Sequence, residues 1–248
     1  MRDLILFISF LFLINCDSTN KKDVVSDYNS VNQDANTSKV IISVYKKNLL
    51  LGKYNYKTDS SFVTIPKSLS NKTIYINKIV KDSFVSMVNA AKKDSIYLIA
   101  VSGTRNFLEQ KRIWDRKWNK LNLNSDTEKA LKILEYSSMP STSRHHWGTD
   151  IDLINLNNSY FESGRGLNEY NWLSNNANKF GFFQVYTSKN NGRTGYNMEK
   201  WHWSFKPLSD RYLDLYLQHI NYVDINGFQG YEVAPEIDVI DKYVNGIE

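Results

Sequence analysis

The segment Ser143-Arg-His-His-Trp-Gly-Thr-Asp-Ile-Asp152 gathers imidazole and carboxylate side chains in one short stretch of this 248-residue chain. A second segment further along, Glu199-Lys-Trp-His-Trp203, adds another imidazole and another carboxylate. Both kinds of side chain are good ligands for Zn²⁺. A catalytic zinc site uses three protein ligands and keeps one position for water, with a general base nearby. The two segments together therefore predict a catalytic zinc site.

The residue types suggest a role for each member of this site. We assign His145, Asp152 and His202 as the zinc ligands and Glu199 as the general base. Such a zinc ion lowers the pKa of its water to about 7, and an unligated Glu can carry the proton to a leaving amine. His146 is a rival ligand to its neighbour. Because adjacent side chains of an extended chain point apart, we expect only one of the two histidines to reach the metal.

The first segment also indicates its local structure. Polar and apolar residues alternate over Asp150–Ile154, which predicts a half-buried strand with Asp150 and Asp152 on one face. Gly148 allows a tight turn between His145 and this strand. The turn would bring both predicted ligands of the segment to one point.

The second segment predicts another strand. Trp201–Phe205 is aromatic and alternating, so His202 should face away from Trp201 and Trp203. Residues three apart on a straight strand face opposite sides. Glu199 must therefore lie on a bend before the strand if it is to share the site with His202.

These segments resemble the M15 family of zinc peptidases, specifically the VanY-like D-alanyl-D-alanine carboxypeptidases. The family pattern S-x-H-x-x-G-x-A-x-D is met by Ser143, His145, Gly148 and Asp152. The pattern E-x-W-H is met by Glu199, Trp201 and His202. A third pattern, close to S-G-Y-R-S-x-x-x-Q, is met by Ser102-Gly-Thr-Arg-Asn-Phe-Leu-Glu-Gln110. Weaker similarities at 49–55 and 172–182 extend the resemblance over roughly Leu49–Phe205.

The resemblance implies a Zn²⁺ cofactor and a D,D-carboxypeptidase that trims peptidoglycan stem peptides. It also implies that Arg105 stabilises the developing oxyanion. L,D-carboxypeptidases, D,D-dipeptidases and endopeptidases of the same family share these motifs and stay open as alternatives. A non-catalytic wall-binding lipoprotein is a further alternative. A degenerate member of that kind should have lost Arg105 or Glu199, and both are present.

Three positions depart from the family patterns. Asp150 replaces a small Ala. This extra carboxylate could either support the metal ligands without touching the metal or compete with them as a ligand. Thr104 and Asn106 replace a Tyr and a Ser, which leaves the substrate preference open. Ser141 stands where the family often has Gly.

The substrate-binding residues are less clearly marked than the metal ligands. Four side chains near the motifs are candidates, namely Ser102, Gln110, Ser141 and Ser143. Ser141, Ser143 and Arg144 are close enough in sequence to the metal ligands to hold the terminal carboxylate of a substrate.

The order of predicted elements indicates an α+β fold. The resemblance to the M15 family implies a hedgehog-like arrangement, with a small central antiparallel sheet flanked by helices and the zinc site in a cleft at the sheet. Besides the two metal-site strands, we expect strands at Val40–Tyr45 and Ile96–Val101. We expect helices at Asp82–Lys93, Phe107–Trp118, Thr127–Tyr136, Asn168–Lys179 and Asp210–Asn221.

The N-terminus resembles a bacterial lipoprotein signal. An apolar run, Leu4–Ile14, is too short to span a bilayer but suits a signal-peptide core. It ends beside Cys16, the only cysteine, in a sequence similar to a relaxed lipobox. An ordinary signal peptide or a short anchor is the alternative. We predict a signal peptide over 1–15, a lipidated Cys16, a flexible tether over 16–38 and a catalytic domain over 39–248.

Charge and composition bear on location and partners. The net charge is +5, and 42% of residues are hydrophobic, enough for a substantial core. The lysines are scattered and no nucleic-acid motif appears, so we expect no nucleic-acid partner. A basic exported protein is attracted to anionic lipid or wall polymer by its overall field. We therefore expect a membrane-anchored lipoprotein that faces the periplasm or cell wall.

Overall fold

The metal-site strands lie side by side in a four-stranded antiparallel sheet. The computed structural model describes residues 46–248. The order of strands is β3 (Ala100–Ser102), β4 (Asp150–Leu153), β6 (His202–Phe205) and β5 (Phe182–Phe183). Asp152 pairs with His202 on one side and with Ser102 on the other. Directly paired residues share a face of the sheet, so the register alone places three predicted site residues together.

The opposite face of the sheet is apolar and packs against helices. Ile151 and Leu153 of β4 join Trp203 and Phe205 of β6 in one buried cluster. Helix α2 (Lys78–Lys93) adds its buried stripe to this cluster, as does α5 (Gly164–Asn176). A short hairpin of β1 (Phe62–Thr64) and β2 (Tyr75–Asn77) leads into α2. The sheet therefore has one core face and one face for the site.

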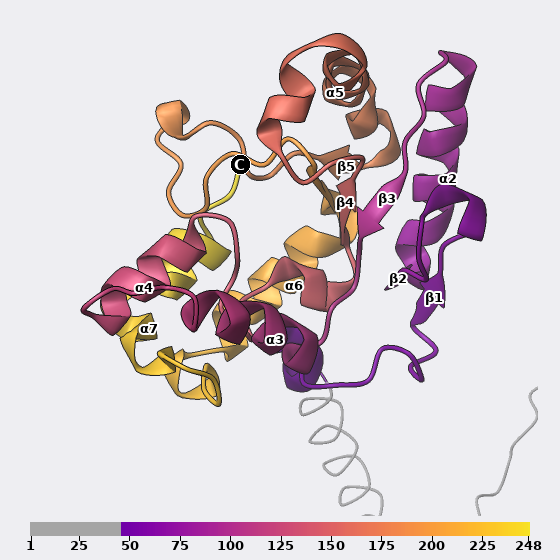
Figure 1. Cartoon of the computed structure of the whole chain (residues 1–248). Helices are drawn as coiled ribbons and strands as arrows, with labels where there is room; N and C mark the ends of the chain where they lie inside the picture. Colours follow the sequence, from indigo (N-terminus) through magenta and orange to yellow (C-terminus); the bar gives the residue numbers. More distant parts are fainter. Residues whose placement is uncertain (1–45) are drawn as a thin grey trace, which may run out of the picture. The chain divides into compact units, whose positions relative to one another are not determined.

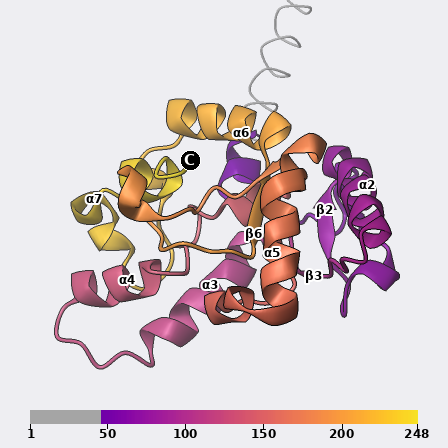
Figure 2. The same ribbon diagram turned by 90° about the horizontal axis from the view of Figure 1, so that it is seen from above.

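A second apolar cluster lies among the remaining helices. It includes residues of α3 (Phe107–Trp118), α4 (Asp126–Leu134), α6 (Lys206–His219) and α7 (Ala234–Ile237). In Figures 1 and 2, α2 with its hairpin lies at one side of the sheet, and α3, α4 and α7 lie at the other. The site face is thus framed by two separately packed halves.

Short helical turns connect these elements. Residues 46–50 are helical. The 3₁₀ turns are η1 (Lys67–Leu69), η2 (Arg144–Trp147), η3 (Asn158–Glu162), η4 (Ala177–Phe180), η5 (Lys189–Asn191), η6 (Tyr222–Asp224) and η7 (Tyr231–Val233), and η8 (Ile240–Val244) is a π-helix.

Several predicted bounds need correction. Helix α2 begins at Lys78, not Asp82, because the Asn77 side chain accepts the Ile79 N–H as an N-cap. Helix α5 begins at Gly164, not Asn168, and is followed by η4, which ends at Gly181 in the left-handed conformation typical of a helix C-terminus. Helix α6 begins at Lys206 with a proline in its first turn. Strand β3 covers only the end of the predicted Ile96–Val101 run.

The strand over Asp150–Leu153 is present, but the prediction that it is half-buried is wrong. All four residues of β4 are buried, as are all four of β6. The alternation of polar and apolar residues separates two covered faces, one packed in the core and one facing the site.

Some expectations fall on other residues. The signal peptide, Cys16, the tether and the strand at Val40–Tyr45 lie outside the described residues. Within 46–248, no helix is both long and apolar enough to cross a membrane.

Candidate metal centre

Three predicted ligands converge on the polar face of the sheet. His145, Asp152 and His202 each offer a ligand atom, and these atoms lie within 4.8 Å of one another. Nε2 of His145 is 3.3 Å from Oδ1 of Asp152, and Nδ1 of His202 is 3.1 Å from the same oxygen. All three side chains are buried. Two imidazole nitrogens and a carboxylate oxygen around one point suit a zinc ion with three protein ligands.

The second nitrogen of each imidazole already has a hydrogen-bond partner. Nδ1 of His145 lies 2.9 Å from the Gly103 carbonyl oxygen, and Nε2 of His202 lies 2.9 Å from Oδ1 of Asp150. When these nitrogens donate, His145 presents Nε2 to the metal position and His202 presents Nδ1. Such hydrogen bonds fix the tautomer and orientation of ligating histidines. The three ligand atoms therefore fit a metal ion, and so do the hydrogen bonds that orient the two imidazole rings.

A left-handed glycine closes the turn between His145 and β4. Gly148 follows η2 with a φ of +70°, and a Cβ there would lie 2.5 Å from the Phe62 ring. The Gly148 carbonyl also accepts the Asn77 N–H at 2.9 Å. Only glycine combines this conformation with so close an approach. The predicted tight turn is confirmed.

Asp150 supports the ligands and is not one of them. Its Oδ1 lies 3.1 Å from Nε of Arg144, and Thr149 donates its hydroxyl to Oδ2 at 2.5 Å. Burial alone would raise the pKa of Asp150, but the Arg144 guanidinium and His202 hold that pKa well below its usual range. Asp150 is therefore a buried anion that orients His202.

Arg144 does not reach the substrate cleft. Its side chain is 1% exposed, and its Nη2 also donates to the Ser204 hydroxyl at 2.7 Å. The suggestion that Arg144 holds a substrate carboxylate is wrong, because this buried guanidinium bonds to Asp150 and Ser204 and, within 46–248, does not line the cleft.

His146 is a structural histidine. Its Nδ1 lies 2.7 Å from the Arg105 carbonyl oxygen, and its Nε2 accepts the Ser141 N–H at 3.2 Å. Burial lowers the pKa of His146 to about 3. Because both ring nitrogens are occupied, His146 joins the metal loop to the arginine segment, and the metal is left to His145.

Glu199 lies beside the ligand atoms on the bend that was predicted. The His202 N–H donates to the Glu199 carbonyl oxygen at 3.3 Å, which closes the turn before β6. Its Oε2 is 3.9 Å from Nδ1 of His202. Burial raises the pKa of Glu199 to about 8, against the opposing effect of His202. A cation bound nearby would lower this pKa towards neutrality, which suits a proton carrier.

The same bend changes the orientation of Trp201. The sequence predicts that Trp201 and Trp203 face away from His202. Trp203 does lie in the core cluster, but Trp201 precedes the strand and borders the same cleft as His202. Its ring lies 6.2 Å from that of Tyr136.

Arg105 is held at the edge of the site. Its Nη1 donates to the Ser102 hydroxyl at 3.0 Å and lies 3.8 Å from Oδ2 of Asp152. The next residue, Asn106, forms a capping box with Glu109 and starts α3. Asn106, which replaces the Ser of the family pattern, therefore acts as the N-cap of α3. Ser102 orients Arg105.

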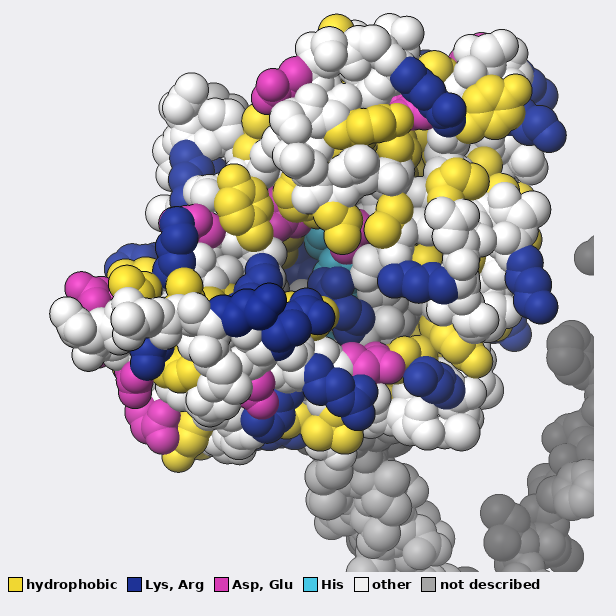
Figure 3. Space-filling model, in the orientation of Figure 1, with side chains coloured by type: hydrophobic (Ala, Val, Ile, Leu, Met, Phe, Trp, Pro, Cys, Tyr) yellow, Lys and Arg dark blue, Asp and Glu magenta, His cyan; other side chains and the backbone are white. Residues whose placement is uncertain are grey.

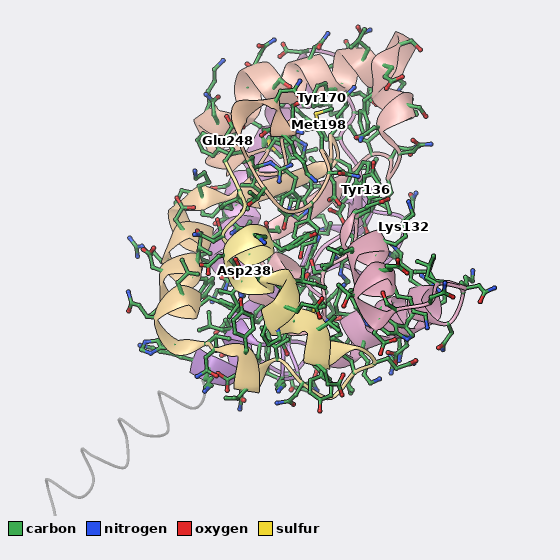
Figure 4. All side chains as sticks on the ribbon, turned by 90° about the vertical axis from the view of Figure 1, so that its left-hand side faces the viewer. Lys132, Tyr136, Tyr170, Met198, Asp238 and Glu248 are labelled. Carbon is green, nitrogen blue, oxygen red and sulfur yellow. The ribbon has the colours of Figure 1, made fainter. Side chains whose placement is uncertain are left out.

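A cleft of about 590 Å³ opens over the ligands. In Figure 3 the histidines are visible at the bottom of a hollow, and Lys and Arg side chains gather beside it. Tyr136, two residues after the end of α4, borders the cleft, and Figure 4 shows it between Lys132 and Met198 in that view. The site is therefore open to a substrate from one face.

The other predicted substrate residues lie at different depths. Gln110 borders the cleft, whereas Ser102 borders the neighbouring hollow around Arg105. Ser141 and Ser143 are buried and, within 46–248, do not border the cleft. A substrate contact for these four side chains stays a prediction.

Sequence reasoning missed several residues of the cleft wall. Tyr186 stacks on His202 with ring centroids 4.5 Å apart, and Lys117 enters from α3. A signal for Lys117 was present, because it lies seven residues after Gln110 on a predicted helix and so shares its face. We find no comparable signal for Tyr186.

Residues 73–208 match the family described as VanY, D-alanyl-D-alanine carboxypeptidase. The chain belongs to the VanY family. It is 33% identical over 130 residues to a putative carboxypeptidase, YodJ, of Bacillus subtilis, covering 52% of this chain and 45% of that protein. It is 30% identical over 134 residues to a D-alanyl-D-alanine carboxypeptidase of Enterococcus faecalis, covering 53% of this chain and 47% of that protein.

The chain spans about half the length of the curated VanY-like relatives it matches. Among solved structures, the LD-carboxypeptidase LdcB is similar, with a TM-score of 0.50 and 26% identity, over 68% of this chain and 81% of that one. The predicted α+β fold, with its small antiparallel sheet, is confirmed.

Proposed function

We propose that this protein is a zinc-dependent D-alanyl-D-alanine carboxypeptidase that removes the terminal D-Ala of peptidoglycan stem peptides. The observation that carries the proposal is the convergence of His145, Asp152 and His202 beside the buried Glu199 in an open cleft. Membership of the VanY family supports the reaction and the substrate class. Both Glu199 and Arg105 are present at the site, which favours an enzyme over a non-catalytic wall-binding protein.

Each polar group of the site has a part in this reaction. When bound, Zn²⁺ supplies Lewis-acid chemistry and lowers the pKa of water. Nε2 of His145, Oδ1 of Asp152 and Nδ1 of His202 would hold it. Glu199 takes a proton from the attacking water and returns it to the leaving amine nitrogen. Arg105 donates to the oxygen on which negative charge develops.

The test uses defined peptides. The zinc-loaded protein is incubated separately with a stem pentapeptide, a stem tetrapeptide and free D-Ala-D-Ala, and products are identified by mass spectrometry. The proposal predicts that the pentapeptide alone loses one D-Ala. The absence of any product from all three peptides would overturn it.

A second candidate is an L,D-carboxypeptidase. The similarity to LdcB favours it, and Thr104 and Asn106 depart from the D,D-type pattern. In the same experiment this candidate predicts an intact pentapeptide and a shortened tetrapeptide. Loss of both alanines as a dipeptide from the pentapeptide, or cleavage of free D-Ala-D-Ala, would indicate the endopeptidase or dipeptidase alternatives.

We also propose that the protein is exported and anchored to a membrane through a lipid on Cys16. The apolar run Leu4–Ile14, which ends two residues before the sole cysteine, supports this. Detergent partitioning and mass spectrometry of the mature N-terminus test it. A Cys16→Ala variant should stay unprocessed or leave the detergent phase, and an unmodified Cys16 in the mature protein would defeat the proposal.

A further inference from the structure

One wall of the cleft holds a cation that the proposed reaction leaves unused. Lys117 lies in the last turn of α3, seven residues after Gln110, and both side chains border the cleft. Trp114 and Trp118 of the same helix pack in the core. The helix therefore presents Lys117 to the cleft together with Gln110, Ile113 and Arg116.

Lys117 is half-buried but lacks an acidic partner. Its Nζ donates to the Ser137 hydroxyl at 2.5 Å, and among residues 46–248 it forms no ion pair. Burial lowers the pKa of Lys117, and the nearby Glu199 opposes this effect. Taking an ammonium group partly out of water without an anion is unfavourable. Such a lysine at the wall of a cleft is suited to receive an anion from a ligand.

The neighbouring groups add unused hydrogen-bonding capacity. The Gln110 side chain is 1% exposed, and its Nε2 donates to the Ser138 carbonyl oxygen at 2.8 Å. Its Oε1 has no partner within the described residues, and its amide keeps a second N–H. The Ser137 hydroxyl also borders the cleft beside Lys117. A buried, partly unsatisfied amide in the same cleft wall as a lysine indicates a site completed by a ligand.

Lys117 lies on the same cleft as the metal centre, where the terminal carboxylate of a substrate must also lie. Lys117 lies near enough to Glu199 and Arg105 for both charges to affect its pKa. In a carboxypeptidase substrate, the free carboxylate follows the scissile carbonyl by a single residue, a span of about 3.8 Å. The anion of the substrate must therefore lie close to the metal centre, on a wall of the same cleft.

We propose that Lys117, with the Ser137 hydroxyl and the Gln110 amide, binds the C-terminal carboxylate of the substrate and so restricts cleavage to the last residue of a peptide. This inference rests on the proposed carboxypeptidase function. It assigns the free carboxylate to the wall of the cleft that α3 forms. Arg144, the earlier candidate, is buried and does not line the cleft.

The test compares a D-Ala-terminated peptide with its C-terminal amide, using the full zinc-loaded protein and a Lys117→Met variant. A charged hydrogen bond of this kind is worth about a 10- to 100-fold effect on kcat/KM. We expect Lys117→Met to lower kcat/KM by this factor for the carboxylate peptide and by less than about threefold for the amide. Lys117→Arg should recover part of the loss, since it restores the positive charge.

The matched control is Lys120→Met, which removes an exposed lysine just beyond the same helix and should leave both substrates unaffected. Zinc content and the melting temperature establish that the Lys117 variants are folded. Equal losses on the two substrates, or no loss on the carboxylate peptide, would overturn the assignment of Lys117. If the unmodified protein cleaves no peptide at all, the proposed function itself fails, which separates the two results.

Discussion

Adjacent histidines have different tasks at the residue scale. His145 gives Nδ1 to a backbone carbonyl and keeps Nε2 for the metal position, whereas His146 uses both nitrogens within the protein. The sequence predicts that only one of them reaches the metal but cannot select it by geometry. The selection depends on Arg105 and Ser141, whose backbone groups meet His146 only in the folded chain.

Glu199 gives the sharpest test of catalysis at this scale. Glu199→Gln keeps the shape of the side chain but removes its capacity to accept and return a proton. We expect zinc content to stay unchanged and kcat to fall by at least about 10²–10⁴. Single-turnover peptide cleavage with parallel metal analysis measures both. Near-normal turnover by the zinc-loaded variant would rule out Glu199 as the base.

Asp150 provides a prediction about stability. Asp150→Ala removes the partner of the fully buried Arg144 guanidinium and of Nε2 of His202. Leaving a buried charge unpaired costs about 3–5 kcal/mol, so the free energy of unfolding in urea should fall by that amount. Asp150→Asn keeps an acceptor and should lose less. Equal stability of Asp150→Ala and the unmodified protein would contradict the supporting role of Asp150.

At the element scale, local signals predicted helices better than strands. Helix α3 spans its predicted bounds because Asn106 and Glu109 form a capping box that is visible in the sequence. Strand β3 is shorter than predicted because only Ala100–Ser102 pairs with β4 in the strand register. Pairing partners and the cover over a polar face come from distant segments, so alternation alone could not show that β4 is buried on both sides.

The turn at Gly148 yields a prediction with a matched control. Gly148→Ala places a Cβ 2.5 Å from the Phe62 ring in a left-handed conformation, whereas Gly192→Ala has φ of +85° and nothing within 4 Å. The left-handed conformation alone costs about 1–2 kcal/mol. We expect the free energy of unfolding to fall by about this amount in Gly192→Ala and by more in Gly148→Ala. The Gly148→Ala variant should also bind zinc more weakly. Equal losses in urea unfolding would show that the close approach is unimportant.

At the scale of the whole molecule, the metal centre links segments that are far apart in sequence. The ligands come from η2, β4 and β6, and the same face continues to α3. The three candidate ligands, which the structure brings together, could be predicted from the sequence because each sits in a dense motif. The seven-residue spacing of Gln110 and Lys117 predicts a shared helix face, but the sequence does not show that this face meets Ser137, because that contact forms only in the folded chain.

Metal removal should therefore weaken the entire fold. A ligand that binds only the folded state at 100 times its Kd stabilises that state by about 2.7 kcal/mol. Chelation should lower the melting temperature of the unmodified protein, and readdition of zinc should restore it. A His202→Ala variant should show little response to either step. An unmodified protein whose melting temperature ignores both chelator and zinc would argue against a bound metal.

The most direct test of the central claim is the zinc content of the purified protein, compared among the unmodified chain, His202→Ala and His219→Ala. His219 is an exposed histidine at the end of α6 and serves as the matched control. If His145, Asp152 and His202 form a zinc site, the unmodified protein and His219→Ala should each carry close to one zinc ion per chain, and His202→Ala should lose most of it. Full retention of zinc by His202→Ala would contradict the assignment.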